Sequence, residues 1–396
     1  MDKIKIVRVI TRLNIGGPAI QASLLTADLD KERFVSTLFT GALSRDEGDM
    51  SYLLVEEGIE PVLVEELTRE VNPLRDLRCL FKLYRYIKKE KPDIIHTHTA
   101  KAGAIGRIAA IMARVPVVIH TFHGHIFHSY FGLLRTRVFL MVERVLARFT
   151  DRIIAVSPTQ KEELLKHLRI RESAKVEIVP LGFKLKRFME SDGGSSRDEV
   201  RSEFRIPPDS FVIGIVGRFA HIKNHRMFIE AAARIKKMMP AGSVKFLIVG
   251  DGELSGEIKA FSRALGIEEE SIFTGWRKDI WRLYKAFDVV CLTSLNEGTP
   301  VSLIEAMASG VPVVSTDVGG VRDIVEEGSS GYLVQLEDTE GFAASVVSLL
   351  KDREKRERFG CHGRKRMAGS HSRERLIKAL EKLYIAETRK KGIRKN

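Results

Sequence analysis

"SLNEGTPVSLIEAMASGVPVVSTDVGG" (residues 294–320) combines a loop, an apolar helix and a Val-rich strand in one short run. Glu297 lies in the loop and Glu305 lies eight positions later, inside the helix. Acidic residues near a helix N-terminus are favourable even without a ligand. Ile304 and Ala306 flank Glu305, however, and such apolar surroundings favour a carboxylate with a role. Because a carboxylate can accept hydrogen bonds from two hydroxyl groups, the stretch predicts a site for a sugar or a ribose.

The same alternation of strand and helix extends outward along the whole chain. Short Val- and Ile-rich runs are "KIKIVRVI", "FVSTLFTG", "PVLV", "DIIHTH", "VPVVIHT" and "DRIIAVS" in the first half, and "FVIGIVG", "VKFLIVG", "SIFTG", "VVCLTS", "VPVVSTD" and "GYLV" in the second. Helix-like segments separate them, which is typical of a parallel sheet with helices on both faces. The pattern occurs twice, so it predicts an α/β protein with two doubly wound domains in series.

Length and composition agree with two domains. The chain has 396 residues, enough for two domains of about 180 residues each. Gly193, Gly194, Ser195 and Ser196 make the clearest linker, so we expect an N-terminal domain over 1–190 and a second domain over 191–370. Residues 371–396 are predicted to form a helix with a basic tail, and its partial apolar stripe should dock on the N-terminal domain. The stripe consists of Leu376, Leu380, Leu383 and Ile385.

Composition and charge limit the function classes. No run approaches the eighteen or so apolar residues of a membrane span, and the opening segment lacks a secretory core, so we expect a cytoplasmic protein. Three scattered cysteines favour neither a disulfide framework nor a zinc knuckle. A formal charge of +13 suits nucleic acid, an anionic membrane or phosphorylated substrates. No nucleic-acid-binding signature is present, so nucleic acid is not an expected partner.

Two loops that follow strands have phosphate-binding character. "GIVGRFAHIKNH" exposes Arg218 and Lys223 before a helix that begins at about residue 224, and cations beside a helix N-terminus suit phosphate oxygens. On spacing alone, the favoured interpretation is that both are solvated loop charges. Gly16 and Gly17 follow the first strand and would let backbone N–H groups approach a phosphate, although a Gly-Gly turn is also a common exit from a strand. No dinucleotide fingerprint or P-loop motif is present.

Histidines are concentrated in two strand ends. Six of the eleven lie in "HTHTAKAG" and "HTFHGHIFH", namely His96, His98, His120, His123, His125 and His128. The density could indicate metal, but no carboxylate pair completes a zinc motif, and a polar wall explains the pattern as well. We therefore expect no metal site.

The helix-like segment 73–90 is basic and amphipathic. Its charged positions include Arg75, Arg78, Lys82 and Arg85, and its expected apolar side consists of Leu74, Leu77, Phe81, Tyr84 and Ile87. Such helices attach to anionic membranes, but most are surface helices packed on a sheet. The aromatic loop that carries Phe127, Tyr130 and Phe131 would also suit lipid contact.

Taken in order, these motifs resemble the retaining, nucleotide-sugar-dependent glycosyltransferases of family four. The resemblance spans almost the entire chain and rests on the Gly-Gly loop, "HTHTAKAG", "TFHGH", "GRFAHIKNH" and "EGTPVSLIEAMASGVPVVSTDVGG". It implies the GT-B fold, in which two Rossmann-like domains face each other across a cleft. The donor nucleotide would then bind the C-terminal domain, and the acceptor mainly the N-terminal one.

The resemblance also assigns roles to individual residues. Arg218 and Lys223 match the positions that neutralise the donor diphosphate. Glu305 matches the residue that binds the ribose hydroxyls, Glu297 the one that contacts the donor sugar, and His123 the histidine near the anomeric centre. The remaining positions expected beside the donor are Gly16, Gly17, Gly298, Thr299, Pro300, Val301 and Ser302.

Fixed cations make a metal cofactor unnecessary in this assignment, because they can stabilise the charge that develops on the leaving diphosphate. The nucleotide sugar is a substrate, so no cofactor is expected. Retention by front-face attack, with the leaving phosphate accepting the acceptor's proton, explains why no glycosidase-like pair of carboxylates appears. Glu297 as a covalent nucleophile is the alternative.

The expected function is transfer from a UDP-sugar to a saccharide or lipid-linked acceptor in surface polysaccharide synthesis, with peripheral contact to an anionic membrane. Three positions depart from the family's common pattern: Leu181 and Lys184 in the interdomain crossover, and Thr299 where an aromatic is frequent. Two alternatives are a UDP-sugar 2-epimerase of the same fold and a non-enzymatic sugar-nucleotide or polyanion-binding protein. The paired Arg218, Lys223, Glu297 and Glu305 disfavour both.

Overall fold

The computed structural model describes residues 2–14, 16–43, 48–68, 70–123, 133–190 and 196–393. It divides into two compact units, one formed by residues 1–183 with 373–396 and the other by residues 184–372. The chain thus crosses to unit 2 after Phe183 and not after residue 190, because helix α7 (Lys186–Met189) packs against helix α12 (Val301–Ala308) of unit 2. The predicted linker glycines, Gly193 and Gly194, lie outside the described residues.

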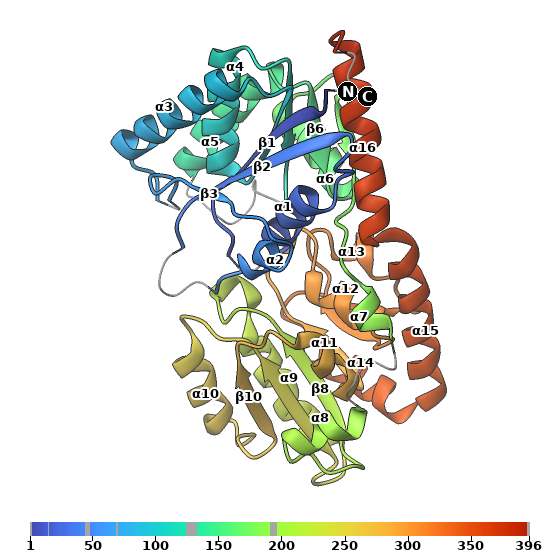
Figure 1. Cartoon of the computed structure of the whole chain (residues 1–396). Helices are drawn as coiled ribbons and strands as arrows, with labels where there is room; N and C mark the ends of the chain where they lie inside the picture. The colour runs from blue at the N-terminus through green and yellow to red at the C-terminus, as the bar shows by residue number, and fades with distance from the viewer. Residues whose placement is uncertain are drawn as a thin grey trace. The chain divides into compact units, whose positions relative to one another are not determined.

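Unit 1 is built on a seven-stranded parallel sheet with the strand order β3-β2-β1-β4-β5-β6-β7 (Figure 1). The strands are β1 (Ile4–Ile10), β2 (Phe34–Thr40), β3 (Val62–Leu63), β4 (Ile94–His98), β5 (Val117–Thr121), β6 (Arg152–Ala155) and β7 (Val176–Ile178). The helices between them are α1 (Gly17–Ala27), α2 (Tyr52–Val55), α3 (Pro73–Glu90), α4 (Ala100–Ala113), α5 (Leu133–Arg148) and α6 (Pro158–Leu168).

Strand β1 is buried on both of its faces, as expected for a central parallel strand. Ile4 and Ile6 pack on one side with helix α16 (Arg373–Lys390), while Val7 and Val9 pack on the other side with α3 and α4. The C-terminal helix therefore completes the core of the first unit, through Leu376, Leu380, Leu383 and Tyr384.

Helix α3 packs on the sheet through only part of the predicted stripe, because Ile87 is buried and Tyr84 lies partly buried against the same core. Its buried residues are Cys79, Leu83 and Ile87. Leu74, Leu77 and Phe81, which were expected on the packed stripe, are 73%, 50% and 49% exposed. The packed side also includes Cys79 and Leu83, and periodicity alone could not tell which apolar positions of the helix meet the sheet.

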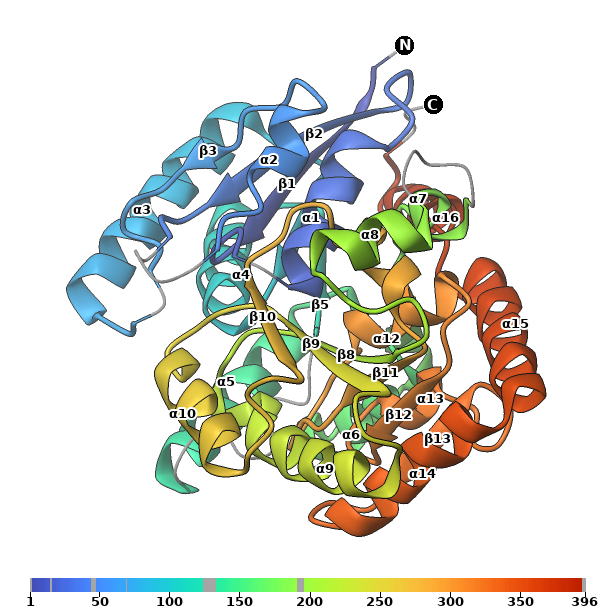
Figure 2. The same cartoon turned by 90° about the horizontal axis from the view of Figure 1, so that it is seen from below.

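Unit 2 is built on a six-stranded parallel sheet with the order β10-β9-β8-β11-β12-β13 (Figure 2). The strands are β8 (Phe211–Val216), β9 (Val244–Val249), β10 (Ser271–Gly275), β11 (Val289–Leu292), β12 (Val313–Thr316) and β13 (Gly331–Val334). Besides α7 and α12, the helices are α8 (Arg197–Glu203), α9 (His225–Met238), α10 (Ser255–Ala264), α11 (Ile280–Leu283), α13 (Val321–Ile324), α14 (Thr339–Lys351) and α15 (Arg353–Ser370). Helices α9 and α14 cover one face of the sheet with a continuous apolar cluster.

Candidate functional site

Both sheets contain the point at which a doubly wound fold binds ligands. In unit 2, β8 lies between β9 and β11, so the chain runs in opposite directions from this centre, and the loops after β8 and β11 diverge to leave a crevice. Lys223 lies in the loop after β8, and Glu297 lies in the loop after β11. The order of the strands therefore brings together two residues that are 74 positions apart in the sequence.

Lys223 and Glu297 form a direct ion pair. The Lys223 Nζ lies 2.6 Å from Glu297 Oε1, and the Ser294 hydroxyl donates to the same oxygen at 2.6 Å. The side chains are 28% and 9% exposed, so the pair is partly withdrawn from water. A bound diphosphate could attract the Lys223 ammonium group away from Glu297. The Glu297 carboxylate could then accept hydrogen bonds from sugar hydroxyls.

The loops that carry this pair are fixed by hydrogen bonds between them. The Leu295 N–H donates to the Ile222 carbonyl at 2.8 Å, and the Thr293 hydroxyl donates to the Asn224 carbonyl at 3.0 Å. Asn224 has a left-handed φ of 45° and precedes helix α9, as predicted for the end of this loop. The position of Lys223 is thus set by backbone contacts and does not depend on its ion pair alone.

A third loop closes on the same edge through a glycine. Gly250, after β9, has φ +133°, and a Cβ there would approach the Gly217 carbonyl oxygen to 2.0 Å. The Phe219 N–H donates to the Asp251 carbonyl at 2.9 Å. Arg218 lies between these contacts and is partly exposed, and its guanidinium makes no hydrogen bond or ion pair with any residue in the described ranges. Sequence reasoning missed Gly250, although "IVGDGE" after a buried strand was a usable signal.

Glu305 is held differently from Glu297. The Tyr284 hydroxyl donates to Glu305 Oε2 at 2.9 Å and also approaches the Ser302 carbonyl at 3.1 Å. Burial raises the pKa of the Glu305 carboxyl to about 7, against the opposing effect of the Tyr284 hydrogen bond. The predicted stabilisation of its charge by the helix N-terminus is therefore not the dominant effect, because Glu305 lies on the fifth residue of α12 among buried neighbours.

The other predicted donor residues form the turn between these carboxylates. Pro300 is the N-cap residue of α12 and Val301 its first residue. Gly298 and Thr299 keep partial exposure, whereas Ser302 is buried. The Glu297 carbonyl accepts a hydrogen bond from the Gly320 N–H at 2.9 Å, which ties this turn to the loop after β12.

Unit 1 has the equivalent switch point between β1 and β4. The Thr11 and Thr99 hydroxyls lie 2.7 Å apart across it, and Thr99 has a positive φ of 64°. Gly16 is the N-cap residue of α1 and Gly17 its first residue, so both predicted glycines lie beyond the carboxyl end of β1.

A row of buried histidines extends along this edge of unit 1. The Arg8 guanidinium and the Tyr384 hydroxyl both lie within hydrogen-bond distance of His96 Nδ1, at 3.1 and 2.7 Å. Arginine can only donate, so His96 Nδ1 is the acceptor and its Nε2–H donates to the Thr121 hydroxyl at 2.7 Å. The contacts therefore fix His96 as a neutral Nε2–H tautomer, and burial together with Arg8 lowers its pKa well below 6.5.

His98 and His123 share one hydrogen bond between two neutral rings. His98 Nδ1 lies 2.9 Å from His123 Nε2. Burial lowers the pKa of His98 well below 6.5 and that of His123 to about 3. Their outer nitrogens, His98 Nε2 and His123 Nδ1, have no partner among the described residues. Whichever ring donates, one N–H and one lone pair are left over, so the pair can bind a hydroxyl group.

Of the other predicted histidines, only His120 lies within the described residues. His120 is bonded to Thr97 at 2.8 Å, while His125, His128, Phe127, Tyr130 and Phe131 lie outside the described residues. No group of three or more His, Cys, Asp or Glu in the described ranges could hold a metal ion. Tyr284, Arg8 and Tyr384 were missed, because each reaches its partner only through the tertiary fold. Ser294 was also missed, although its partner Glu297 is only three residues away.

Family models of glycosyltransferases match the residues of both units. A family model described as Glycosyltransferase Family 4 matches residues 15–187, and one described as Glycosyl transferases group 1 matches residues 196–366. The chain is 33% identical over 313 residues to the UDP-Gal:alpha-D-GlcNAc-diphosphoundecaprenol alpha-1,3-galactosyltransferase of Escherichia coli, covering 78% of this chain and 80% of the relative. It is 29% identical over 322 residues to the capsular polysaccharide biosynthesis glycosyltransferase CapM of Staphylococcus aureus, covering 80% and 83%.

The fold also matches a solved structure. HepE of Anabaena, solved in complex with UDP, superimposes with a TM-score of 0.80 at 22% identity, covering 97% of this chain and all of the other. At this identity the likeness bears on the fold, and it confirms the predicted pair of Rossmann-like units. Sequence relatives and fold together establish that the chain belongs to family four of the GT-B glycosyltransferases.

Proposed function

We propose that this glycosyltransferase moves a sugar from a UDP-sugar to a saccharide or lipid-linked saccharide acceptor in surface polysaccharide synthesis, with retention of anomeric configuration. The observation that carries the proposal is the Lys223–Glu297 pair at the switch point of unit 2. Relatives lend support to the donor and the pathway: the Escherichia coli relative is a UDP-Gal galactosyltransferase, and CapM is a capsular polysaccharide enzyme. HepE has been solved with UDP.

The cations would act on the leaving group. Breaking the anomeric C–O bond transfers negative charge to the β-phosphate, and fixed donors at that position stabilise the transition state. Lys223, drawn from Glu297 by the diphosphate, and Arg218, which has no carboxylate partner in the described part of the chain, would supply this charge. With two cations in place the proposal requires no metal.

The carboxyl groups would hold the two ends of the donor. Glu297, released from Lys223, would accept hydrogen bonds from the donor sugar, and the turn at Gly298 and Thr299 would place backbone groups beside it. Glu305 would accept the ribose hydroxyls, which favours its ionised form and opposes the effect of burial on its pKa.

His123 would contribute a hydrogen bond and not a transferable proton. Its pKa of about 3 keeps the ring neutral at physiological pH. In a front-face mechanism the leaving phosphate accepts the proton of the attacking hydroxyl, so no protonated histidine is needed. The unpartnered nitrogens of the His98–His123 pair would bind a sugar hydroxyl.

Thermal stabilisation of the purified protein by nucleotides tests the donor. A ligand at one hundred times its Kd adds about 2.7 kcal/mol. We expect UDP to stabilise more than GDP or ADP, equally with and without EDTA, and Glu305→Ala to weaken the response. A folded sample that responds to no nucleotide contradicts the proposal, and loss of the response in EDTA contradicts metal independence.

Product analysis tests the reaction itself. We expect UDP release from a UDP-hexose or UDP-N-acetylhexosamine only when a saccharide acceptor is present, and an α-linked product from an α-linked donor in the proton NMR spectrum. Conversion of the donor sugar without an acceptor would indicate an epimerase instead.

A further inference from the structure

Helix α5 carries an apolar stripe that faces away from the protein. Val138, Met141, Val145 and Phe149, at its end, are 51%, 60%, 48% and 56% exposed. Spacings of three and four residues place all four on one side of the helix. The core side is occupied by other residues, including Leu146 and Ala147. Packing within the described chain therefore does not account for the stripe.

Helix α4 continues this apolar surface. It contacts α5, and Ile108 and Met112 on it are 36% and 44% exposed. Figure 1 shows α3, α4 and α5 on the same side of unit 1, and α3 contacts α4. The apolar surface thus spans neighbouring helices, which isolated surface residues do not do.

The charges on the same surface are of one sign. Arg114, Arg137 and Arg148 are exposed, and none of them pairs with a carboxylate in the described ranges. Between them α4 and α5 contain one acidic residue, Glu143, and it is fully buried, where both its oxygens accept from Arg107 at 2.7 Å. We call these six apolar residues and three arginines the α4–α5 face; it presents no carboxylate.

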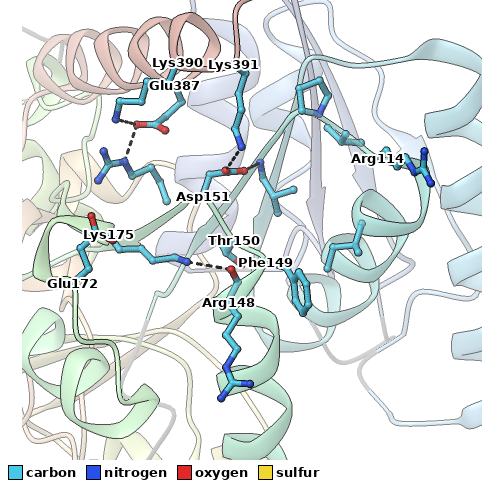
Figure 3. A pocket seen from close by; sticks show the side chains of 15 residues that line it. Arg114, Arg148, Phe149, Thr150, Asp151, Glu172, Lys175, Glu387, Lys390 and Lys391 are labelled. Carbon is cyan, nitrogen blue, oxygen red and sulfur yellow. Dashed lines mark hydrogen bonds and ion pairs between the residues drawn. The ribbon is translucent and has the colours of Figure 1, made fainter.

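At the C-terminal ends of both helices the α4–α5 face meets a pocket of about 500 Å³ (Figure 3). Arg114, Arg148 and Phe149 line it together with Lys175. Two of its acids are already neutralised: Asp151 pairs with Lys391 at 2.7 Å, and Glu387 pairs with Arg152 at 2.7 Å and Lys390 at 2.8 Å. The pocket adds cationic surface to the end of the face.

We propose that the α4–α5 face docks unit 1 on an anionic lipid bilayer. Apolar side chains in a helix surface flanked by arginines match the boundary between acyl chains and headgroups, and anionic lipids attract cations that have no carboxylate nearby. A second copy of this chain is a poorer partner, because a formal charge of +13 and two arginine-bearing faces would oppose each other. The proposal goes beyond the glycosyl-transfer reaction and needs neither donor nor acceptor.

Sedimentation of the full-length protein with lipid vesicles tests the proposal. We expect strong binding to vesicles of phosphatidylglycerol and phosphatidylcholine, and weak binding to phosphatidylcholine alone. Arg137→Gln with Arg148→Gln should weaken binding by about fivefold for each cation removed. Val145→Glu should weaken it by about tenfold or more, since it places a carboxylate in the apolar stripe.

Matched controls come from helix α9 of unit 2, where Met238 and Lys237 are also exposed. Met238→Glu and Lys237→Gln should bind vesicles as the unchanged protein does. All variants should keep their circular dichroism spectrum and their response to UDP, so that loss of docking is separated from misfolding and from failure of the proposed function.

Three outcomes would overturn the proposal. The first is equal binding to both kinds of vesicle, and the second is normal binding by Val145→Glu and the double arginine variant. The third is a change of oligomeric mass caused by these variants in lipid-free solution, which would make the face a contact between copies.

Discussion

The two switch points have the same topology and opposite chemistry. At the β8/β11 switch the functional groups are charged and partly exposed, with Lys223 against Glu297 and Arg218 nearby in the loop after β8. At the β1/β4 switch they are pairs of hydroxyls and of neutral histidines, in which Thr11 and His98 are buried and Thr99 and His123 are partly buried. The same sheet topology can thus position charged side chains or neutral hydroxyl and imidazole groups. The sequences of the loops determine which of the two is present.

The difference suits the two substrates of a glycosyl transfer. A diphosphate leaving group needs fixed positive charge, whereas an incoming sugar hydroxyl needs neutral donors and acceptors that leave it nucleophilic. Charged groups at the switch point of the donor unit, and neutral hydroxyls and histidines at that of the acceptor unit, are what our proposed function requires. The following experiments would sharpen or break this contrast.

Loss of the Lys223 cation at the β8/β11 switch point should have the largest effect on activity. Lys223→Ala removes a group that acts on the leaving diphosphate, so we expect kcat to fall about 10² to 10³-fold. Lys236→Ala is the matched control, because Lys236 pairs with Glu270 at 2.9 Å on the surface of the same unit. Comparable activity of the two variants in a UDP-release assay would show that Lys223 does not act on the leaving diphosphate.

His123 of unit 1 and Glu305 of unit 2 should make stability depend on pH in opposite directions. In unit 1 the folded state keeps His123 neutral with a pKa of about 3, while the unfolded chain takes up a proton below about 6.5. Because of this group, the free energy of unfolding is about 2 kcal/mol lower at pH 5 than above pH 6.5. In unit 2 Glu305 keeps its proton up to about pH 7, whereas the unfolded chain loses it above about 4.5. Its contribution therefore falls as the pH rises from 4.5 to 7.

Hydrogen exchange followed by mass spectrometry at pH 5 and pH 7.5 reads each unit separately. After correction for the chemical exchange rate, β4 and β5 should be less protected at pH 5. The contribution of Glu305 should make β11 and β12 less protected at pH 7.5, against the opposite effect of His225, whose pKa burial lowers to about 4. His123→Asn should reduce the first trend and Glu305→Gln the second. The assignment of Glu305 is refuted if Glu305→Gln leaves the pH trend of β11 and β12 unchanged, and that of His123 if His123→Asn leaves the trend of β4 and β5 unchanged.

Removal of one tyrosine hydroxyl from each unit should give the smallest effects and the most specific ones. Tyr384→Phe leaves Arg8 and His96 without a shared partner and should cost about 1 kcal/mol of stability in urea denaturation. Tyr284→Phe removes the hydrogen bond that lowers the pKa of Glu305, so UDP affinity should fall severalfold. If Tyr284→Phe leaves UDP affinity unchanged, Glu305 does not bind the ribose.

Sequence patterns anticipated the two sheets because buried parallel strands are apolar runs of limited length. They also anticipated α12, since Pro300 and the apolar run mark its start. The ion pair between Lys223 and Glu297 could not be anticipated from spacing, because it depends on which strands are neighbours. The raised pKa of Glu305 was missed because burial is a tertiary property that overrides the helix terminus.

Helix α16 has a consequence for how the protein is made. A ribosome completes residues 1–183 long before it reaches the helix that covers Ile4 and Ile6 and supplies Tyr384 to Arg8. At 5 to 20 residues per second, synthesis of residues 184–372 takes on the order of 10 to 40 s. During that interval the nascent first unit lacks the helix that covers this apolar sheet face, so its core can be completed only after residues 373–390 have been made.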